Sequence, residues 1–212
     1  MEQRDYRSTQ IANIASPAVG FILSIPGLIA LTLHALSDGN GVHILTFIIF
    51  GSSLVISYAL FTLYHIFKFH ARWGKLFKIL DHSTIFLLIA ATYTPFTLVF
   101  LRGRWGWTLF AAAWVIAVLG VILKIFYIHR FKVLGPLIYL AMGWLIILVI
   151  KPAVELIPVA GLLLLLAGGL FYSFGLIFYA WKRLRFHHAI WHLFVLAGSS
   201  CHYIAVYSHV IS

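Results

Sequence analysis

The sequence predicts an all-α integral membrane protein built from seven transmembrane helices. Of its 212 residues, 63% are hydrophobic and only 9% are charged, whereas a soluble domain carries roughly a quarter charged residues. Apolar runs of about 18 residues or more, which is the length needed to cross a bilayer as a helix, recur along the whole chain. The short alternating segments of a transmembrane barrel are not visible. Because the connections between the runs are short, we expect residues 1–212 to form a single seven-helix transmembrane domain.

Each apolar run becomes one predicted span. Pro26 and Pro95 lie within the first and third runs, where we expect kinks. Gly161, Gly168 and Gly175 recur every seven residues in the sixth run, which predicts a smooth face for close helix packing. With ends uncertain by about 2–4 residues, the predicted spans are residues 14–36, 43–67, 80–101, 105–126, 133–150, 158–181 and 188–210.

Lysine and arginine gather on one side of these spans. Twelve of the fifteen lie in the N-terminal tail or in the second, fourth and sixth connections. Because basic residues are retained in the cytoplasm, we predict a cytoplasmic N-terminus and a C-terminus outside. The net charge of +10 then attracts anionic lipid head groups, and the loops are too short to build a basic surface for nucleic acid. The twelve are Arg4, Arg7, Lys68, Arg72, Lys75, Lys78, Lys124, Arg130, Lys132, Lys182, Arg183 and Arg185, and the other three are Arg102, Arg104 and Lys151.

Four ionisable residues fall at one predicted depth, near the cytoplasmic face. His65 ends the second span, Asp81 opens the third, and His188 and His192 open the seventh. His188 and His192 are i and i+4, so both rings leave one face of a helix. Three imidazoles with a free fourth position are typical of catalytic zinc. Asp81 would then act as general base, hold a water molecule or orient a ligating ring.

Each of these residues also has a simpler interpretation. A single histidine near a helix end is ordinarily an interfacial residue, and Asp81 alone could cap its helix. Only the coincidence of all four on three helices favours a metal site. The imidazoles suit zinc, and they would also suit iron, nickel or copper.

The remaining histidines are expected to play lesser parts. His202 lies ten residues beyond His192, about 15 Å deeper, so we expect a polar cavity residue bonded to Ser57, Ser199 or Tyr93. The others are expected in exposed loops or at their borders: His34, His43 and His209 outside, and His70, His82, His129 and His187 inside.

Several segments resemble the haemolysin III proteins, the bacterial branch of the progestin and adiponectin Q receptor family. The resemblance covers most of the chain, in IANIASPAVGFILSIPGL, LYHIF, LDHSTIFLLIAATYTPF and HHAIWHLFVLAGSSCHYIAVY. It implies seven helices, a bacterial inner (plasma) membrane and zinc held by three histidines, which map onto His65, His188 and His192. The family's aspartate maps onto Asp81. Phe61 stands where the family pattern has a serine, and Thr62 and Ser57 are the nearby hydroxyls.

The resemblance also bears on function, since relatives in the wider superfamily look like metal-dependent hydrolases of lipid amides such as ceramides. We therefore expect membrane lipids as partners and a lipid amide or fatty acid as ligand, and the oligomeric state stays open. The alternative is a receptor-like or membrane-modulating, haemolysin-type protein in which zinc is structural. The spans contain no ring of charges that would indicate a large pore. The seventh span has no lysine to bind retinal. A two-haem bundle would need a second histidine on the helix of His65, spaced as His188 and His202 are, and the second span has none.

Overall fold

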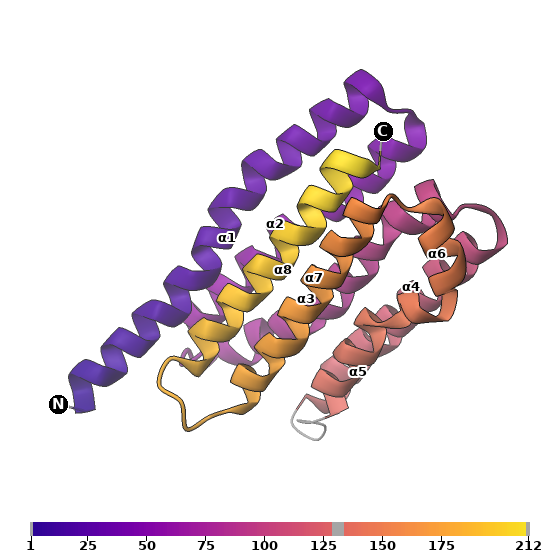
Figure 1. Cartoon of the computed structure of the whole chain (residues 1–212). Coiled ribbons are helices and arrows are strands. Elements are labelled where there is room, and N and C mark those ends of the chain that lie inside the picture. Colours follow the sequence, from indigo (N-terminus) through magenta and orange to yellow (C-terminus); the bar gives the residue numbers. More distant parts are fainter. Residues whose placement is uncertain (1, 129–133, 211–212) are drawn as a thin grey trace.

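The computed structural model describes residues 2–128 and 134–210, all of whose regular elements are helices (Figure 1). Seven helical stretches in this part of the chain are long and apolar enough to cross a membrane, which confirms the predicted fold class. The elements are α1 (Glu2–Asp38), α2 (Gly41–Phe67), α3 (Gly74–Pro95), the π-helical turn η1 (Phe96–Leu101), α4 (Gly103–Tyr127), α5 (Leu134–Gly143), the 3₁₀ turn η2 (Leu145–Val149), α6 (Ile150–Leu156), α7 (Val159–Ala180) and α8 (His187–His209).

The helices pack mainly on their chain neighbours, and α8 closes the bundle. α1 lies against α2 and α8, α2 against α3, α3 against α4, and α7 against α8. Tyr58, Phe47, Phe50 and Phe86 are among the largest fully buried side chains. Leucines and isoleucines on the outer faces of α1 and α7 are exposed, as is expected of surfaces that face lipid.

Two helices begin earlier than predicted. α1 starts at Glu2 rather than near residue 14, and α3 starts at Gly74 rather than near residue 80. The predicted first residues of these helices mark where the hydrophobic segment begins. A helix does not stop there, because polar side chains such as Lys and Gln are also good helix formers.

The fifth span is broken near its centre into α5, η2 and α6. The Tyr93 hydroxyl, from α3, bridges the break: it donates to the Gly143 carbonyl (2.8 Å) and accepts from the Ile146 amide (3.2 Å). The Trp144 indole also donates to Ser173 Oγ on α7 (3.1 Å). The backbone groups freed by the break are thus satisfied inside the protein, which is required at membrane depth.

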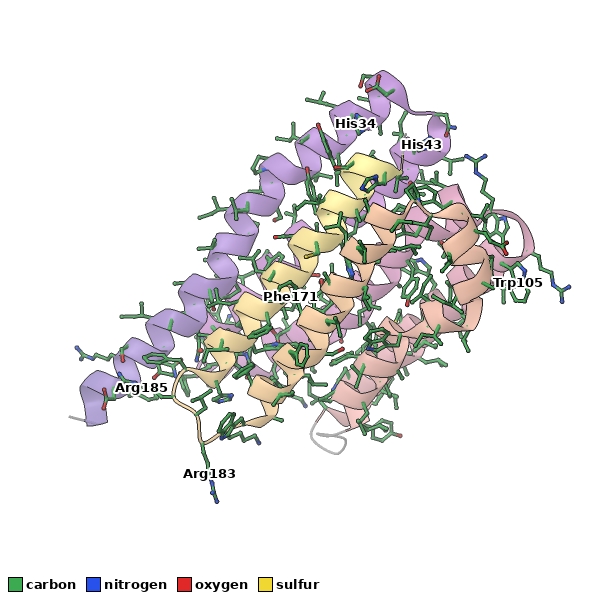
Figure 2. The ribbon with its side chains drawn as sticks, viewed as in Figure 1. His34, His43, Trp105, Phe171, Arg183 and Arg185 are labelled. Carbon is green, nitrogen blue, oxygen red and sulfur yellow. The ribbon has the colours of Figure 1, made fainter. Side chains whose placement is uncertain are left out.

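The two ends of the bundle differ in composition. The N-terminus and the α7–α8 connection lie at one end, and the C-terminus lies at the other (Figure 1). Arg185 in that connection pairs with Asp5 of α1 (2.8 Å). Figure 2 places Arg183 and Arg185 at the N-terminal end and His34 and His43 at the opposite end. The two termini thus lie at opposite ends of the bundle, and which end faces the cytoplasm stays a prediction.

Candidate metal centre

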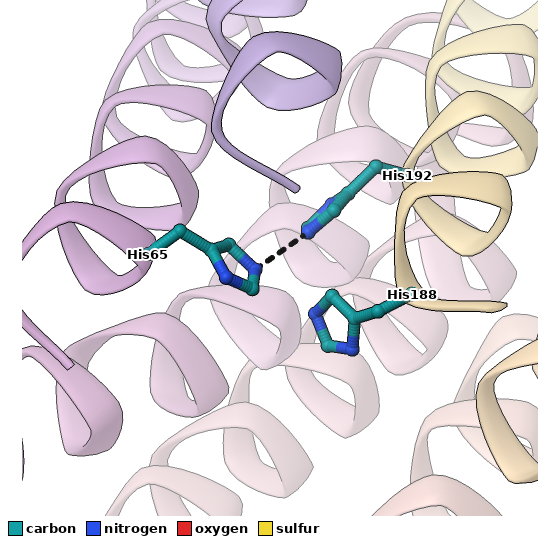
Figure 3. Close-up of side chains that lie close together, drawn as sticks. All are labelled: His65, His188 and His192. Carbon is teal, nitrogen blue, oxygen red and sulfur yellow. Dashed lines mark hydrogen bonds between the residues drawn. The ribbon is translucent and has the colours of Figure 1, made fainter. Parts of the chain in front are cut away.

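Three histidines meet at the N-terminal end of the bundle (Figure 3). His65 lies in the last turn of α2, and His188 and His192 lie in the first two turns of α8. One ring nitrogen from each lies within 4.8 Å of the others. The Nε2 atoms of His65 and His192 are 3.1 Å apart, and both rings are buried. The structure therefore brings together the three residues that the sequence selected.

This group fits a tetrahedral metal ion. Two imidazole nitrogens bound to zinc at about 2.0–2.1 Å are separated by roughly 3.3 Å, close to the 3.1 Å between His65 and His192. The Nδ1 atoms of both rings are buried without a hydrogen-bond partner, so the two rings turn their Nε2 atoms toward a common point. The three donors leave a fourth position for water or substrate, and they do not select one metal among those that imidazole suits.

Lys68 lies just beyond the end of α2, one turn after His65. Its ammonium interacts electrostatically with the His65 ring. Burial lowers the pKa of the Lys68 ammonium, because desolvation disfavours its charged form.

Asp81 is buried on α3 and interacts with its neighbour in sequence. Its Oδ2 atom lies 2.9 Å from Nδ1 of His82. Among the described residues, the group that could hold an ion contains the three histidines and does not include Asp81. Electrostatic interactions reach Asp81 from Tyr64 of α2, Tyr179 of α7 and Lys124 of α4. The predicted role of Asp81 toward the metal thus stays a prediction.

An apolar cavity of about 310 Å³ lies within the bundle. It is lined by residues of α2, α3, η1, α5, η2, α6, α7 and α8, and His202 of α8 is among them. The His202 Nε2 atom lies 3.3 Å from the Leu165 carbonyl, so the expected partners for this ring were wrong. Ser57 and Thr62, which we also expected in a cavity, do not line it. The Ser57 hydroxyl bonds to that of Thr84 (3.0 Å), and Thr62 donates to the Tyr58 carbonyl (2.8 Å).

Phe61 lies between the cavity and the three histidines. It lines the cavity, and its ring centroid is 5.6 Å from that of His192. Only 3% of Phe61 is exposed, and Tyr58 packs edge-on against it at 5.7 Å. Phe61 is thus in contact with both the cavity and one of the three histidines.

The chain is similar to known proteins over almost its whole length. A sequence model of haemolysin-III-related proteins matches residues 6–203. The chain belongs to the haemolysin III family. It is 49% identical to Hemolysin-3 of Bacillus cereus over 202 residues, which cover 95% of this chain and 92% of the relative. It is 44% identical to the Hemolysin-3 homolog of Bacillus subtilis (strain 168), over 93% of this chain and 92% of the relative. The human monocyte to macrophage differentiation factor is 30% identical over 97% of this chain and 87% of its own length.

His43 and His82 of this haemolysin III protein differ from the expectation of exposed loop residues. His34, His187 and His209 are also only partly exposed, and His129 lies outside the described residues. His43 is buried in the first turn of α2, where its ring accepts from the Asn40 amide as part of a capping box. His82 is half-buried and pairs with Asp81. Each has a polar partner close by in the sequence, Asn40 for His43 and Asp81 for His82. A nearby partner of this kind was the signal from which the burial of these two rings could have been predicted.

Two further polar residues, Asn13 and Ser16 of α1, were not predicted to be buried. Both are buried, and Oδ1 of Asn13 and Oγ of Ser16 have no hydrogen-bond partner. Gly20 of α1 packs against the ring of Tyr58 on α2. Along the two helices, the offset from Gly20 back to Asn13 equals the offset from Tyr58 forward to His65. Because α1 and α2 are antiparallel, Asn13 lies at about the depth of His65. Asn13 lies one residue before the start of the predicted first span, in the segment predicted to be the N-terminal tail.

Proposed function

We propose that the chain is a zinc-dependent hydrolase of lipid amides such as ceramides, which acts in a bacterial inner membrane with its N-terminus in the cytoplasm. The observation that supports this most directly is a buried three-histidine group beside an apolar cavity of acyl-chain character. Membership in the haemolysin III family supports the same ligand set.

His65, His188 and His192 would hold the ion. Zinc at such a site supplies Lewis-acid polarisation of a carbonyl and lowers the pKa of a bound water toward about 7. Asp81 is the carboxylate proposed as general base: it takes a proton from the attacking water and delivers it to the leaving amine nitrogen. The cavity would hold the acyl chain, since burial of apolar chains away from polar groups provides most of the affinity for a lipid.

The test is turnover of a ceramide panel by detergent-purified protein, measured as released fatty acid. Wild type should release fatty acid, and D81N should lose at least about 100-fold in kcat, as expected for removal of a general base, while its metal content stays unchanged. Turnover retained in D81N would contradict the role of Asp81. A wild type that binds metal and consumes no lipid amide would contradict the hydrolase proposal.

A second function is favoured by one observation, the position of Phe61 between the cavity and His192. In this alternative the protein is receptor-like or membrane-modulating, and zinc only fastens α2 to α8. The expected result is then that H188A lowers the unfolding temperature by several degrees and that no lipid amide is consumed by wild type. Turnover by wild type would contradict the alternative.

A further inference from the structure

Asp81 and His82 are consecutive residues of α3 with different surroundings. The side chain of Asp81 is 7% exposed and that of His82 is 18% exposed, so only the imidazole reaches the edge of the protein. The Tyr64 ring of α2 packs against both His82 and His65, with ring centroids 6.2 Å and 5.1 Å away. The pair therefore lies close to the candidate metal centre without belonging to it.

The hydrogen-bond geometry fixes which nitrogen of His82 carries a proton. Nδ1 faces two oxygen atoms at 2.9 Å, Oδ2 of Asp81 and the carbonyl of Lys78. A carbonyl and an ionised carboxylate can only accept. The ring therefore carries a proton on Nδ1, which it donates to the Lys78 carbonyl and shares with Oδ2 of Asp81.

The ring is also held from outside α3. The Tyr139 hydroxyl, from α5, donates to the His82 carbonyl at 2.6 Å, and the Tyr64 ring of α2 meets the imidazole edge-on at 6.2 Å. These contacts limit both the backbone and the side chain of His82. The donor is thus placed before any substrate arrives, which is what a positioned catalytic group requires.

Other groups around Asp81 act at longer range. Tyr64, Tyr139 and Tyr179 lie within electrostatic range of the carboxyl group, on α2, α5 and α7, and so does Lys124 on α4. Among the described residues, the hydrogen bond given to the carboxylate side chain is that from His82.

We infer that His82 is the positioning residue of Asp81: its Nδ1–H holds Oδ2 and leaves Oδ1 free to take the proton of the attacking water. This inference rests on the proposed hydrolase function. The water oxygen bonds to the amide carbonyl carbon while one of its O–H bonds breaks and the proton passes to Oδ1. The C–N bond then breaks, and the same proton passes to the leaving amine nitrogen. His82 keeps its own proton throughout, so the cycle needs no further acid or base.

The test uses amide side chains that imitate one ring nitrogen each. The amide nitrogen of Asn falls near Nδ1 of histidine, and that of Gln falls near Nε2. H82L and H82Q should lower kcat by about 10- to 100-fold, the usual cost of losing a partner of a catalytic group, with KM and metal content unchanged. H82N should recover most of the lost turnover. H70L is the matched control, because His70 at the same end of the bundle accepts hydrogen bonds from the backbone of its own loop and should leave kcat unchanged.

Full turnover in H82L, or equal recovery by H82Q and H82N, would overturn the inference. A second readout does not depend on turnover: the infrared band of the Asp81 carboxyl group, identified by its absence in D81N. This band should shift in H82L and H82Q and stay in place in H82N, and an unshifted band in H82L would overturn the hydrogen bond itself. If wild type consumes no lipid amide but the Asp81 band still shifts in H82L, the hydrolase proposal is contradicted and the hydrogen bond between His82 and Asp81 is established.

Discussion

At the scale of single residues, Phe61 bears most directly on the proposed function. Its ring both lines the apolar cavity and contacts His192, so one side chain separates the space for a lipid from the atoms that would act on it. A buried aromatic ring can move aside only if its neighbours give way, because protein interiors are close-packed. The size of this side chain should therefore control access to the metal centre.

The first prediction concerns this ring. F61S should join the cavity to the metal centre and raise turnover of ceramides by about tenfold, while the metal content stays at the wild-type level. The loss of a buried aromatic side chain should cost about 3 kcal/mol of stability. Turnover and unfolding temperature are measured together, with F61A as the variant that removes the ring and adds no hydroxyl. No change in turnover in either variant would show that Phe61 does not control access.

The second prediction concerns the hydroxyl that bridges the broken span. Y93F should destabilise the protein by about 1–3 kcal/mol, because the Gly143 carbonyl and the Ile146 amide would each lose a partner in a buried place. Thermal unfolding in detergent measures this. Y207F is the control, since Tyr207 is 40% exposed. Equal unfolding temperatures for Y93F and Y207F would contradict the bridging role.

At the scale of elements, the agreement between sequence and structure follows the strength of the pattern. The glycine face predicted in the sixth span is confirmed, since Gly161, Gly168 and Gly175 of α7 are all buried and contact side chains of α8. The break in the fifth span was not predicted. Pro152, in the first turn of α6, is a local signal for a helix start after the break, but the break also depends on Tyr93, a residue of another helix. A tertiary contact of this kind leaves no local signal in the sequence.

The third prediction tests the packing of α7 on α8. A methyl group added at Gly168 would meet the His202 ring and lie 3.1 Å from the Gly198 carbonyl, whereas at the neighbouring Gly169 it would find its nearest atom, in Trp144, at 3.7 Å. G168A should therefore lower stability by about 1–3 kcal/mol, and G169A should stay close to wild type. Similar unfolding temperatures for the two variants would mean that the helices do not approach this closely.

At the scale of the whole molecule, the site could be located because depth and charge are coupled in a membrane protein. Loop charges alone put His65, His188 and His192 at one depth, and the structure brings them together. What the sequence could not give is the lateral arrangement, such as the contact of Phe61 with His192 or the pairing of Asp81 with His82. Those contacts depend on how each helix is rotated about its own axis, and loop charges carry no information about rotation.

The fourth prediction tests the orientation. In a C201S background, a cysteine at Ser37 should react with a membrane-impermeant maleimide added to intact cells, because we place that end of the bundle outside. A cysteine at Arg183, an exposed residue at the other end, should react only after the cells are opened. The reverse pattern would place the N-terminus and the three histidines on the outer side.

The central claim is that His65, His188 and His192 hold a metal ion, and metal analysis of purified protein tests it most directly. We expect about one zinc per chain in wild type, loss of that zinc in H192A, and retention in H202A, whose histidine lies on the same helix but lines the cavity. A wild type without metal, or an H192A variant that keeps it, would contradict the claim.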